Sequence, residues 1–113
     1  MKIEHYSFGK IIIDGKSYTS DVIIYPDRVN ASWWRKEGHN LSISDLTDVI
    51  KTKPDILVVG TGYSGVMRVP QETLMHLESN GITVKVSRSS EAVEIFNALR
   101  KDKKVVAALH LTC

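Results

Sequence analysis

The densest run of side chains that could do chemistry is Trp-Trp-Arg-Lys-Glu-Gly-His, at residues 33–39. A guanidinium such as that of Arg35 suits carboxylates and phosphates. If residues 29–34 form a strand, Trp33 lies on its apolar face and Trp34 on its polar face. This pattern predicts a surface that binds an anionic group through Arg35 and stacks on it through Trp34. The alternative is structural: Trp34 covers a sheet edge and Arg35 pairs with an acid.

A glycine-rich segment, Gly-Thr-Gly-Tyr-Ser-Gly, occupies residues 60–65 directly after an apolar run. A dinucleotide-binding loop of this spacing opens a helix at once, and an acidic residue follows the next strand. Here the next helix signal waits until Pro70, and the next strand leads into Ser87-Arg88. The sequence therefore predicts no nucleotide cofactor, and nothing else in it indicates a cofactor of another kind.

The glycines of this segment still indicate a close approach of the backbone to a ligand. Glycine has no side chain to hold a ligand away, and ligands favour the carboxyl edge of strands in α/β sheets. Gly60, Gly62 and Gly65 therefore predict a groove lined by backbone amides. The alternative is a tight irregular turn without a ligand.

Two histidines, His39 and His110, are possible proton carriers, because only histidine has an ordinary pKa near neutral pH. His110 and Cys113 form a His-x-x-Cys pair, but structural zinc sites need four ligands and usually take two from a Cys-x-x-Cys pair. No metal site is predicted. Cys113 is the sole cysteine, so no disulfide can form within the chain.

Charge and hydropathy narrow the class of partner. The chain has 113 residues and a net charge of +2, and its basic cluster at residues 100–104 is interrupted by an acid. That cluster is typical of a helix end followed by a turn, so nucleic-acid binding is disfavoured. No apolar run approaches the roughly 20 residues of a membrane span. The first residues carry no apolar signal region, and the expected location is cytoplasmic.

The elements expected around these residues change character along the chain. The first part is rich in strands, with a hairpin turn at Asp14-Gly15, and residues 29–34 are its last predicted strand. Helices and strands then alternate, which predicts a mainly parallel sheet with right-handed crossovers. Strands are expected at residues 56–59, 82–86 and 105–111, and helices behind Ser42, Pro70 and Ser89. The sequence thus predicts one α/β domain over residues 1–113, in which the first strands extend the sheet or form a second small layer.

The order and spacing of several motifs resemble a known family. The motifs are Val-Ile-Ile-Tyr-Pro at 22–26, Trp-Trp-Arg-Lys-Glu-Gly-His at 33–39, Pro-Asp-Ile-Leu-Val-Val-Gly-Thr-Gly at 54–62, Gly-Ile at 81–82, Glu-Ala-Val at 91–93 and Leu-His-Leu-Thr-Cys at 109–113. They resemble a small uncharacterised domain family that includes the human adipogenesis-associated protein and a mitochondrial complex I assembly factor. The resemblance covers essentially the whole chain.

This resemblance implies a three-layer α/β fold, with a central mixed sheet and a small N-terminal β layer. It implies no established activity, and its eukaryotic members suggest assembly or adaptor roles. The positions expected to form a shared surface are Trp34, Arg35, Gly60, Gly62 and Gly65.

Together these observations favour a non-catalytic binding or assembly-type domain, with a groove between the Gly60–Gly65 loop and Trp34-Arg35. The expected partner is a protein or a small anionic ligand. The alternative is a small enzyme or ligand-binding protein that acts on an anionic metabolite in the same groove, with His39 or His110 as the base. Whether the chain is an enzyme stays open at this point, with the balance against it.

Overall fold

A small antiparallel sheet forms the first layer of the protein, whose computed structural model covers residues 1–113. Its strands, in the spatial order β1-β2-β3, are β1 (Ile3–Ser7), β2 (Lys10–Ile13) and β3 (Lys16–Tyr18). Between β2 and β3, Asp14 and Gly15 have φ values of 50° and 80°. Positive φ at both central positions is what a type I′ turn requires, so the hairpin predicted at this dipeptide is confirmed.

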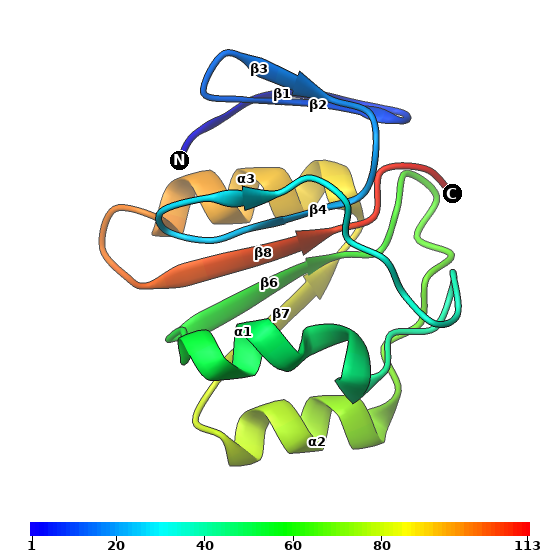
Figure 1. The fold of residues 1–113 in the computed structure, drawn as a ribbon, viewed down its shortest axis with the longest axis vertical. Coiled ribbons are helices and arrows are strands. Elements are labelled where there is room, and N and C mark those ends of the chain that lie inside the picture. Colours follow the sequence, from blue (N-terminus) through cyan, green and yellow to red (C-terminus); the bar gives the residue numbers. More distant parts are fainter.

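The second sheet is mixed and lies at the centre of the molecule (Figure 1). Its strands are β4 (Val22–Ile24), β5 (Val29–Asn30), β6 (Ile56–Gly60), β7 (Thr83–Ser87) and β8 (Val105–Leu109), in the order β5-β4-β8-β6-β7. Strand β6 pairs in parallel with β7 and β8, whereas β4 runs antiparallel to β8 and β5. All residues of β6 and β8 are buried, as expected for strands covered on both faces.

Helices cover both faces of this sheet. They are the short 3-10 helix η1 (Ile43–Leu46) and the α-helices α1 (Thr47–Thr52), α2 (Gln71–Ser79) and α3 (Ser89–Leu99). Figure 1 shows α3 on the face toward the small sheet and α1 and α2 on the opposite face. The Asn97 side chain ties α3 to β1, because it bonds both the amide and the carbonyl of Ile3. No helix is both long and apolar enough to cross a membrane.

The alternation of side chains along the central strands fills two apolar cores. On β4, Val22 and Ile24 face the α3 core, while Ile23 faces the α1–α2 core. The α3 core also receives Ile11 and Ile13 from the small sheet. The predicted three-layer α/β fold with a central mixed sheet and a small β layer is thus confirmed.

One predicted strand is wrong: the segment 29–34 forms a strand only at Val29–Asn30. The Asn30 side-chain oxygen accepts a hydrogen bond from the Ser32 amide at 3.0 Å. This local turn of asparagine replaces the strand ladder. The chain then bends back, and the Trp33 amide donates to the Asp21 carbonyl at 3.1 Å. The two tryptophan side chains nevertheless lie in different environments, as predicted: Trp33 is buried and Trp34 is exposed.

Candidate functional site

A buried polar cluster forms where β4 begins and β8 ends. Antiparallel pairing places Val22 opposite Leu109, so the adjoining Asp21 and His110 leave the sheet side by side. Oδ2 of Asp21 lies 2.8 Å from Nδ1 of His110. Oδ1 of Asp21 accepts a hydrogen bond from the amide of Leu111 at 2.7 Å. The carboxylate therefore holds the chain in place just beyond the last strand.

Arg35 completes this cluster from the loop that follows β5. Its Nη2 lies 2.8 Å from Oδ2 of Asp21, and its side chain is only 4% exposed. Nε and Nη2 also donate to the Gly38 carbonyl, at 3.2 and 2.9 Å. The guanidinium lies 4.6 Å from the centre of the Trp33 ring. Arg35 thus joins its own loop to the ends of two strands.

The electrostatics of the cluster favour an ionised Asp21. Burial alone would raise the pKa of this carboxyl, but hydrogen bonds from His110, the Leu111 amide and Arg35 outweigh it, so the pKa lies below its ordinary value. The opposite charge of Arg35 compensates the carboxylate within the protein. Binding of an external anion by Arg35 stays a prediction, and of its nitrogens only Nη1 is without a partner.

The two predicted proton carriers lie together but differ in access. Nε2 of His110 is buried without a hydrogen-bond partner. The ring of His39 lies edge-on to that of His110, with 5.7 Å between centroids, and His39 is exposed. A proton carrier must come within about 3 Å of a substrate atom. His110 is buried, so a substrate would not reach its ring in this conformation. A role for His39 or His110 in proton transfer stays a prediction.

The Gly60–Gly65 loop packs against the chain's own C-terminal segment, residues 110–113. A Cβ on Gly60 would lie 2.7 Å from both Leu109 Cδ2 and Ser89 Oγ. Gly62 has a φ of +110°, and a Cβ there would collide with the backbone of Cys113 and lie 2.5 Å from the carbonyl oxygen of Thr112. At both positions, glycine is required by the close approach of this protein's own atoms.

The amides of this loop bond almost entirely within the chain. Tyr63 donates to the Thr112 carbonyl at 2.8 Å, and Ser64 and Val66 both donate to the Cys113 carbonyl at 3.1 Å. The amide of Gly62 donates to Ser89 Oγ at 3.0 Å. Gly65, whose φ is +74°, closes a turn onto the Gly62 carbonyl. The C-terminal segment thus occupies the space beside Gly62, and ligand binding at Gly60, Gly62 and Gly65 stays a prediction.

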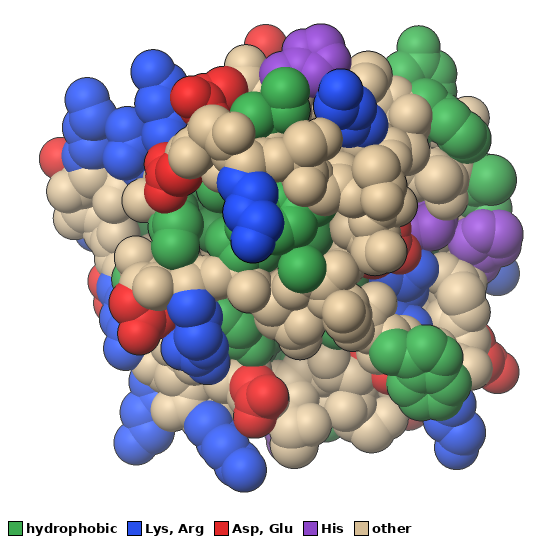
Figure 2. Space-filling view, turned by 45° about the horizontal axis from the view of Figure 1, so that its top comes forward, with side chains coloured by type: hydrophobic (Ala, Val, Ile, Leu, Met, Phe, Trp, Pro, Cys, Tyr) green, Lys and Arg blue, Asp and Glu red, His purple; other side chains and the backbone are tan.

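Exposed hydrophobic side chains border this loop. We call Phe8, Tyr63 and Val66 the loop patch; they are 57%, 55% and 44% exposed. The rings of Phe8 and Tyr63 pack edge to face, with 5.8 Å between centroids. Gly9 donates to the carbonyl of Leu111, which brings the β1–β2 turn beside the C-terminal segment. Figure 2 shows hydrophobic side chains at the centre of the face and at its upper right, and the right is the side on which Figure 1 places the C terminus.

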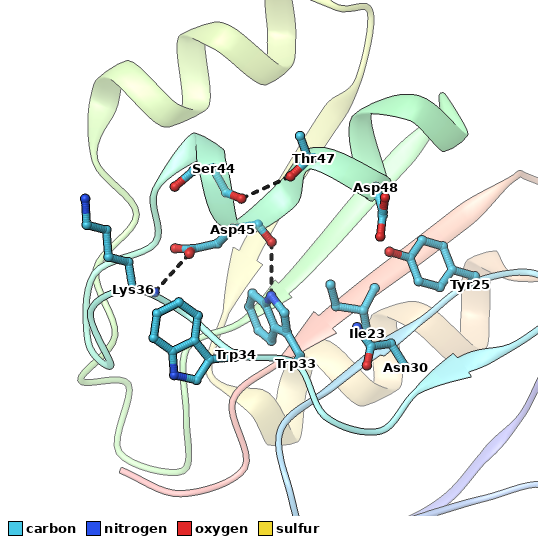
Figure 3. A pocket seen from close by; sticks show the side chains of 10 residues that line it. All are labelled: Ile23, Tyr25, Asn30, Trp33, Trp34, Lys36, Ser44, Asp45, Thr47 and Asp48. Atoms are coloured by element: carbon cyan, nitrogen blue, oxygen red, sulfur yellow. Dashed lines mark hydrogen bonds between the residues drawn. The ribbon is translucent and has the colours of Figure 1, made fainter.

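Trp34 contributes to a different feature, an open cavity of about 480 Å³. The side chain of Trp34 is 76% exposed. The lining comes from β4, β5, residues 33–36 and the start of the first helices (Figure 3): Ile23, Tyr25, Asn30, Trp33, Trp34, Lys36, Ser44, Asp45, Thr47 and Asp48. No residue of the Gly60–Gly65 loop is among them. A groove that joins this loop to Trp34 and Arg35 stays a prediction.

The layers and the topology define the class of the protein: a small three-layer α/β domain with an added antiparallel sheet. Comparison with family models makes this more specific. Residues 3–110 match the family described as "Protein of unknown function (DUF498/DUF598)". The chain belongs to this family, which confirms the resemblance noted in its sequence.

Individual relatives agree with this assignment. The chain is 29% identical over 111 residues to NADH dehydrogenase [ubiquinone] 1 alpha subcomplex assembly factor 3 of Xenopus tropicalis, covering 96% of this chain and 59% of the relative. The conserved hypothetical protein PH1505 of Pyrococcus horikoshii OT3 has a similar structure, with a TM-score of 0.86, 30% identity and full coverage of both chains. The protein MT938 gives a TM-score of 0.83 at 23% identity, over 99% of this chain and 98% of its own, and shows the fold alone.

Sequence reasoning missed Asp21, the residue that organises the buried cluster. A signal was available, because Asp21 precedes one apolar strand and His110 follows another. If antiparallel pairing of these two strands had been predicted, Asp21 and His110 would have been placed together at one edge of the sheet. Asp45 and Asp48 were missed as well, because the segment behind Ser42 was predicted only as a helix.

Proposed function

We propose that this protein is a non-catalytic, assembly-type domain that docks a protein partner on the loop patch. The observation that carries the proposal is that Phe8, from the β1–β2 turn, meets the segment after β6 that carries Tyr63 and Val66. Large apolar side chains grouped on a surface are typical of protein interaction sites, and aromatic residues are enriched there. The segment after β6 is held by backbone hydrogen bonds to residues 112 and 113, so the patch is ordered before a partner arrives.

The same contacts favour a protein partner over a small anionic ligand. An anion at the Gly60–Gly65 loop would need free amides, and the amides of Gly62, Tyr63, Ser64 and Val66 already donate within the chain. Arg35, the expected anion contact, is paired with Asp21. The alternative function, action on an anionic metabolite, therefore requires the C-terminal segment to leave the loop.

The relative from Xenopus tropicalis supports the assembly role, because its name describes an assembly factor. The chain spans 59% of that protein, so its role extends to this chain as a proposal only. In this reading, the chain holds a subunit of a larger complex during assembly. A cytoplasmic location is part of the same proposal.

Site-specific photo-cross-linking tests the docking surface. A p-benzoyl-phenylalanine is placed at position 8 or 63, and in a control at position 75, because Met75 is equally exposed (59%) but lies on α2. After irradiation in native extract, we expect discrete adducts from positions 8 and 63 with the same partner and none from position 75. Equal cross-linking from all three positions, or none from positions 8 and 63, would refute the proposal.

Anionic ligands are tested separately by thermal unfolding. The panel contains inorganic phosphate, nucleotides and carboxylates. A ligand at 100 times its dissociation constant adds about 2.7 kcal/mol to stability. The docking proposal predicts no shift of the midpoint with this panel. A shift that disappears in Arg35→Lys would favour the metabolite function.

A further inference from the structure

The cavity beside Trp34 has aromatic walls of fixed orientation. The indole Nε1 of Trp33 donates to the Asp45 carbonyl at 3.1 Å, and Tyr25 is almost fully buried. Both rings already carry a cation of the chain: the guanidinium of Arg28 lies 4.0 Å from the Tyr25 ring centre, and that of Arg35 lies 4.6 Å from Trp33. Trp34 is the third aromatic ring that lines the cavity, and no cation of the chain lies over it.

The cavity is lined by two carboxylates, that of Asp45 on the Lys36 side and that of Asp48 on the Tyr25 side (Figure 3). The Asp45 carboxylate is already bonded, since it accepts from the amides of Lys36 and Ser42 and from the Ser42 hydroxyl. Asp48 differs, because only its backbone carbonyl receives a side-chain donor, the Thr52 hydroxyl. Figure 3 shows the Asp48 carboxylate directed toward Tyr25. Its charge adds to the effect of burial in raising the pKa of Tyr25.

The third charged side chain of the lining, Lys36, does not offset the charge of these carboxylates. Figure 3 shows the Lys36 ammonium directed away from the space between Trp34 and Asp48. The lining therefore carries two carboxylates and one ammonium, and the ammonium points outward. An exposed indole and a carboxylate without a hydrogen bond line the same cavity, and these are the two groups that attract organic cations, through the ring face and through the charge.

We propose that this cavity binds a guanidinium or alkylammonium group, with the charge on Asp48 and the apolar stem against Trp34. The site is separate from the loop patch, and the inference is independent of the proposed function. The cation can belong to a small amine or to an arginine or lysine side chain of another polypeptide. Both sources present the same chemistry to the cavity.

Titration of the isotope-labelled protein by NMR tests the proposal. Trp33 and Trp34 are the two tryptophans of the chain and both line the cavity, so both indole N–H signals report on it. The probe is N-acetyl-arginine amide, and the matched neutral probe is N-acetyl-citrulline amide. We expect saturable shifts of both indole signals with the arginine probe, and affinity at least about fivefold weaker for the citrulline probe.

Variants locate the two contacts. Asp48→Asn should lower the affinity for the arginine probe to that for citrulline, and Trp34→Ala should abolish the shift of the Trp33 signal. Asp48 and Trp34 are exposed, so both variants should fold, which the dispersion of the same spectra verifies. Asp102→Asn, an exposed site outside the cavity, is the control and should bind as the parent does.

Two results would overturn the proposal: equal affinity for the arginine and citrulline probes, or no shift with either at tens of millimolar. The source of the cation is then resolved by comparing agmatine with a capped Gly-Arg-Gly peptide. Tighter binding of the peptide supports a polypeptide side chain, and tighter binding of agmatine supports a small amine.

Discussion

The Gly60–Gly65 loop and the Trp34 cavity lie in one small domain, yet their surfaces are built in opposite ways. The loop has the amides of Tyr63 and Ser64 bonded to residues 112 and 113, and Gly62 is pressed against the same backbone. The cavity keeps an exposed indole and an unbonded carboxylate open to solvent. Glycines at a strand end can thus mark internal packing, whereas an exposed aromatic and an exposed acid that line one cavity mark the place where we propose binding.

The largest effect on stability is expected at Asp21, which holds the start of the C-terminal segment in place. Asp21→Ala leaves the Arg35 guanidinium buried without its counter-charge and removes the acceptor of the Leu111 amide. Loss of one partner of a buried ion pair costs about 3–5 kcal/mol, measurable as the free energy of unfolding in urea. Asp27→Ala, at the exposed pair with Arg28, should change it by less than about 1 kcal/mol. Equal losses of stability in the two variants would contradict a buried ion pair between Asp21 and Arg35.

The next effect separates crowding from backbone strain at the loop. In Gly62→Ala the new Cβ meets the Cys113 backbone at a φ of +110°, whereas in Gly81→Ala it meets no atom within 4 Å at a φ of +79°. Positive φ alone costs about 1–3 kcal/mol. Gly62→Ala should therefore destabilise the protein clearly more than Gly81→Ala, and should speed amide exchange at Tyr63 and Val66. Similar values for both variants would mean that the C-terminal segment does not press on Gly62.

The pH dependence of the stability that the Asp21 cluster contributes follows from the lowered pKa of Asp21. A carboxyl whose pKa is lower in the folded state contributes stability above its unfolded pKa, near 3.8, and loses it as the pH falls through the folded value. The stability difference between the parent and Asp21→Asn should therefore be constant at pH 5–7 and should narrow below about pH 4. Urea midpoints at several pH values measure it. A difference independent of pH down to pH 2 would argue against an ionised Asp21.

The smallest effect on stability is expected in the open region. Trp34→Ala removes an exposed ring and should change the free energy of unfolding by no more than about 0.5 kcal/mol. Trp33 is buried and bonded to Asp45, so Trp33→Ala should cost about 3–5 kcal/mol. A large loss in Trp34→Ala would show that its ring is covered in solution.

The sequence predicted the elements well wherever local chemistry decides them. Asp14-Gly15 fixes a turn by its backbone angles, and the apolar runs of β6 and β8 fit only strands covered on both faces. The segment after Asn30 was mispredicted because a side-chain hydrogen bond to Ser32 competes with the strand ladder, and alternation of residue types does not reveal that competition.

The candidate site was harder to predict because it depends on contacts distant in the sequence. Asp21, Arg35 and His110 meet only through the antiparallel placement of β4 beside β8. The glycines were predicted to let the backbone approach a ligand, which stays a prediction; the atoms that crowd Gly62 belong to the C-terminal segment, which sequence spacing cannot place. Trp34 was correctly separated from Trp33, although the reason given, a strand register, was wrong.

Hydrogen exchange at the amides of Tyr63 and Val66 tests the central claim, the closure of the loop by the C-terminal segment, most directly. Both donate to backbone carbonyls of residues 112 and 113. We expect exchange slowed by orders of magnitude relative to a free peptide, at a level comparable to amides within β6. Exchange at the rate of an unstructured loop would show that the segment leaves Gly60–Gly65 readily, and that the loop is open to ligands after all.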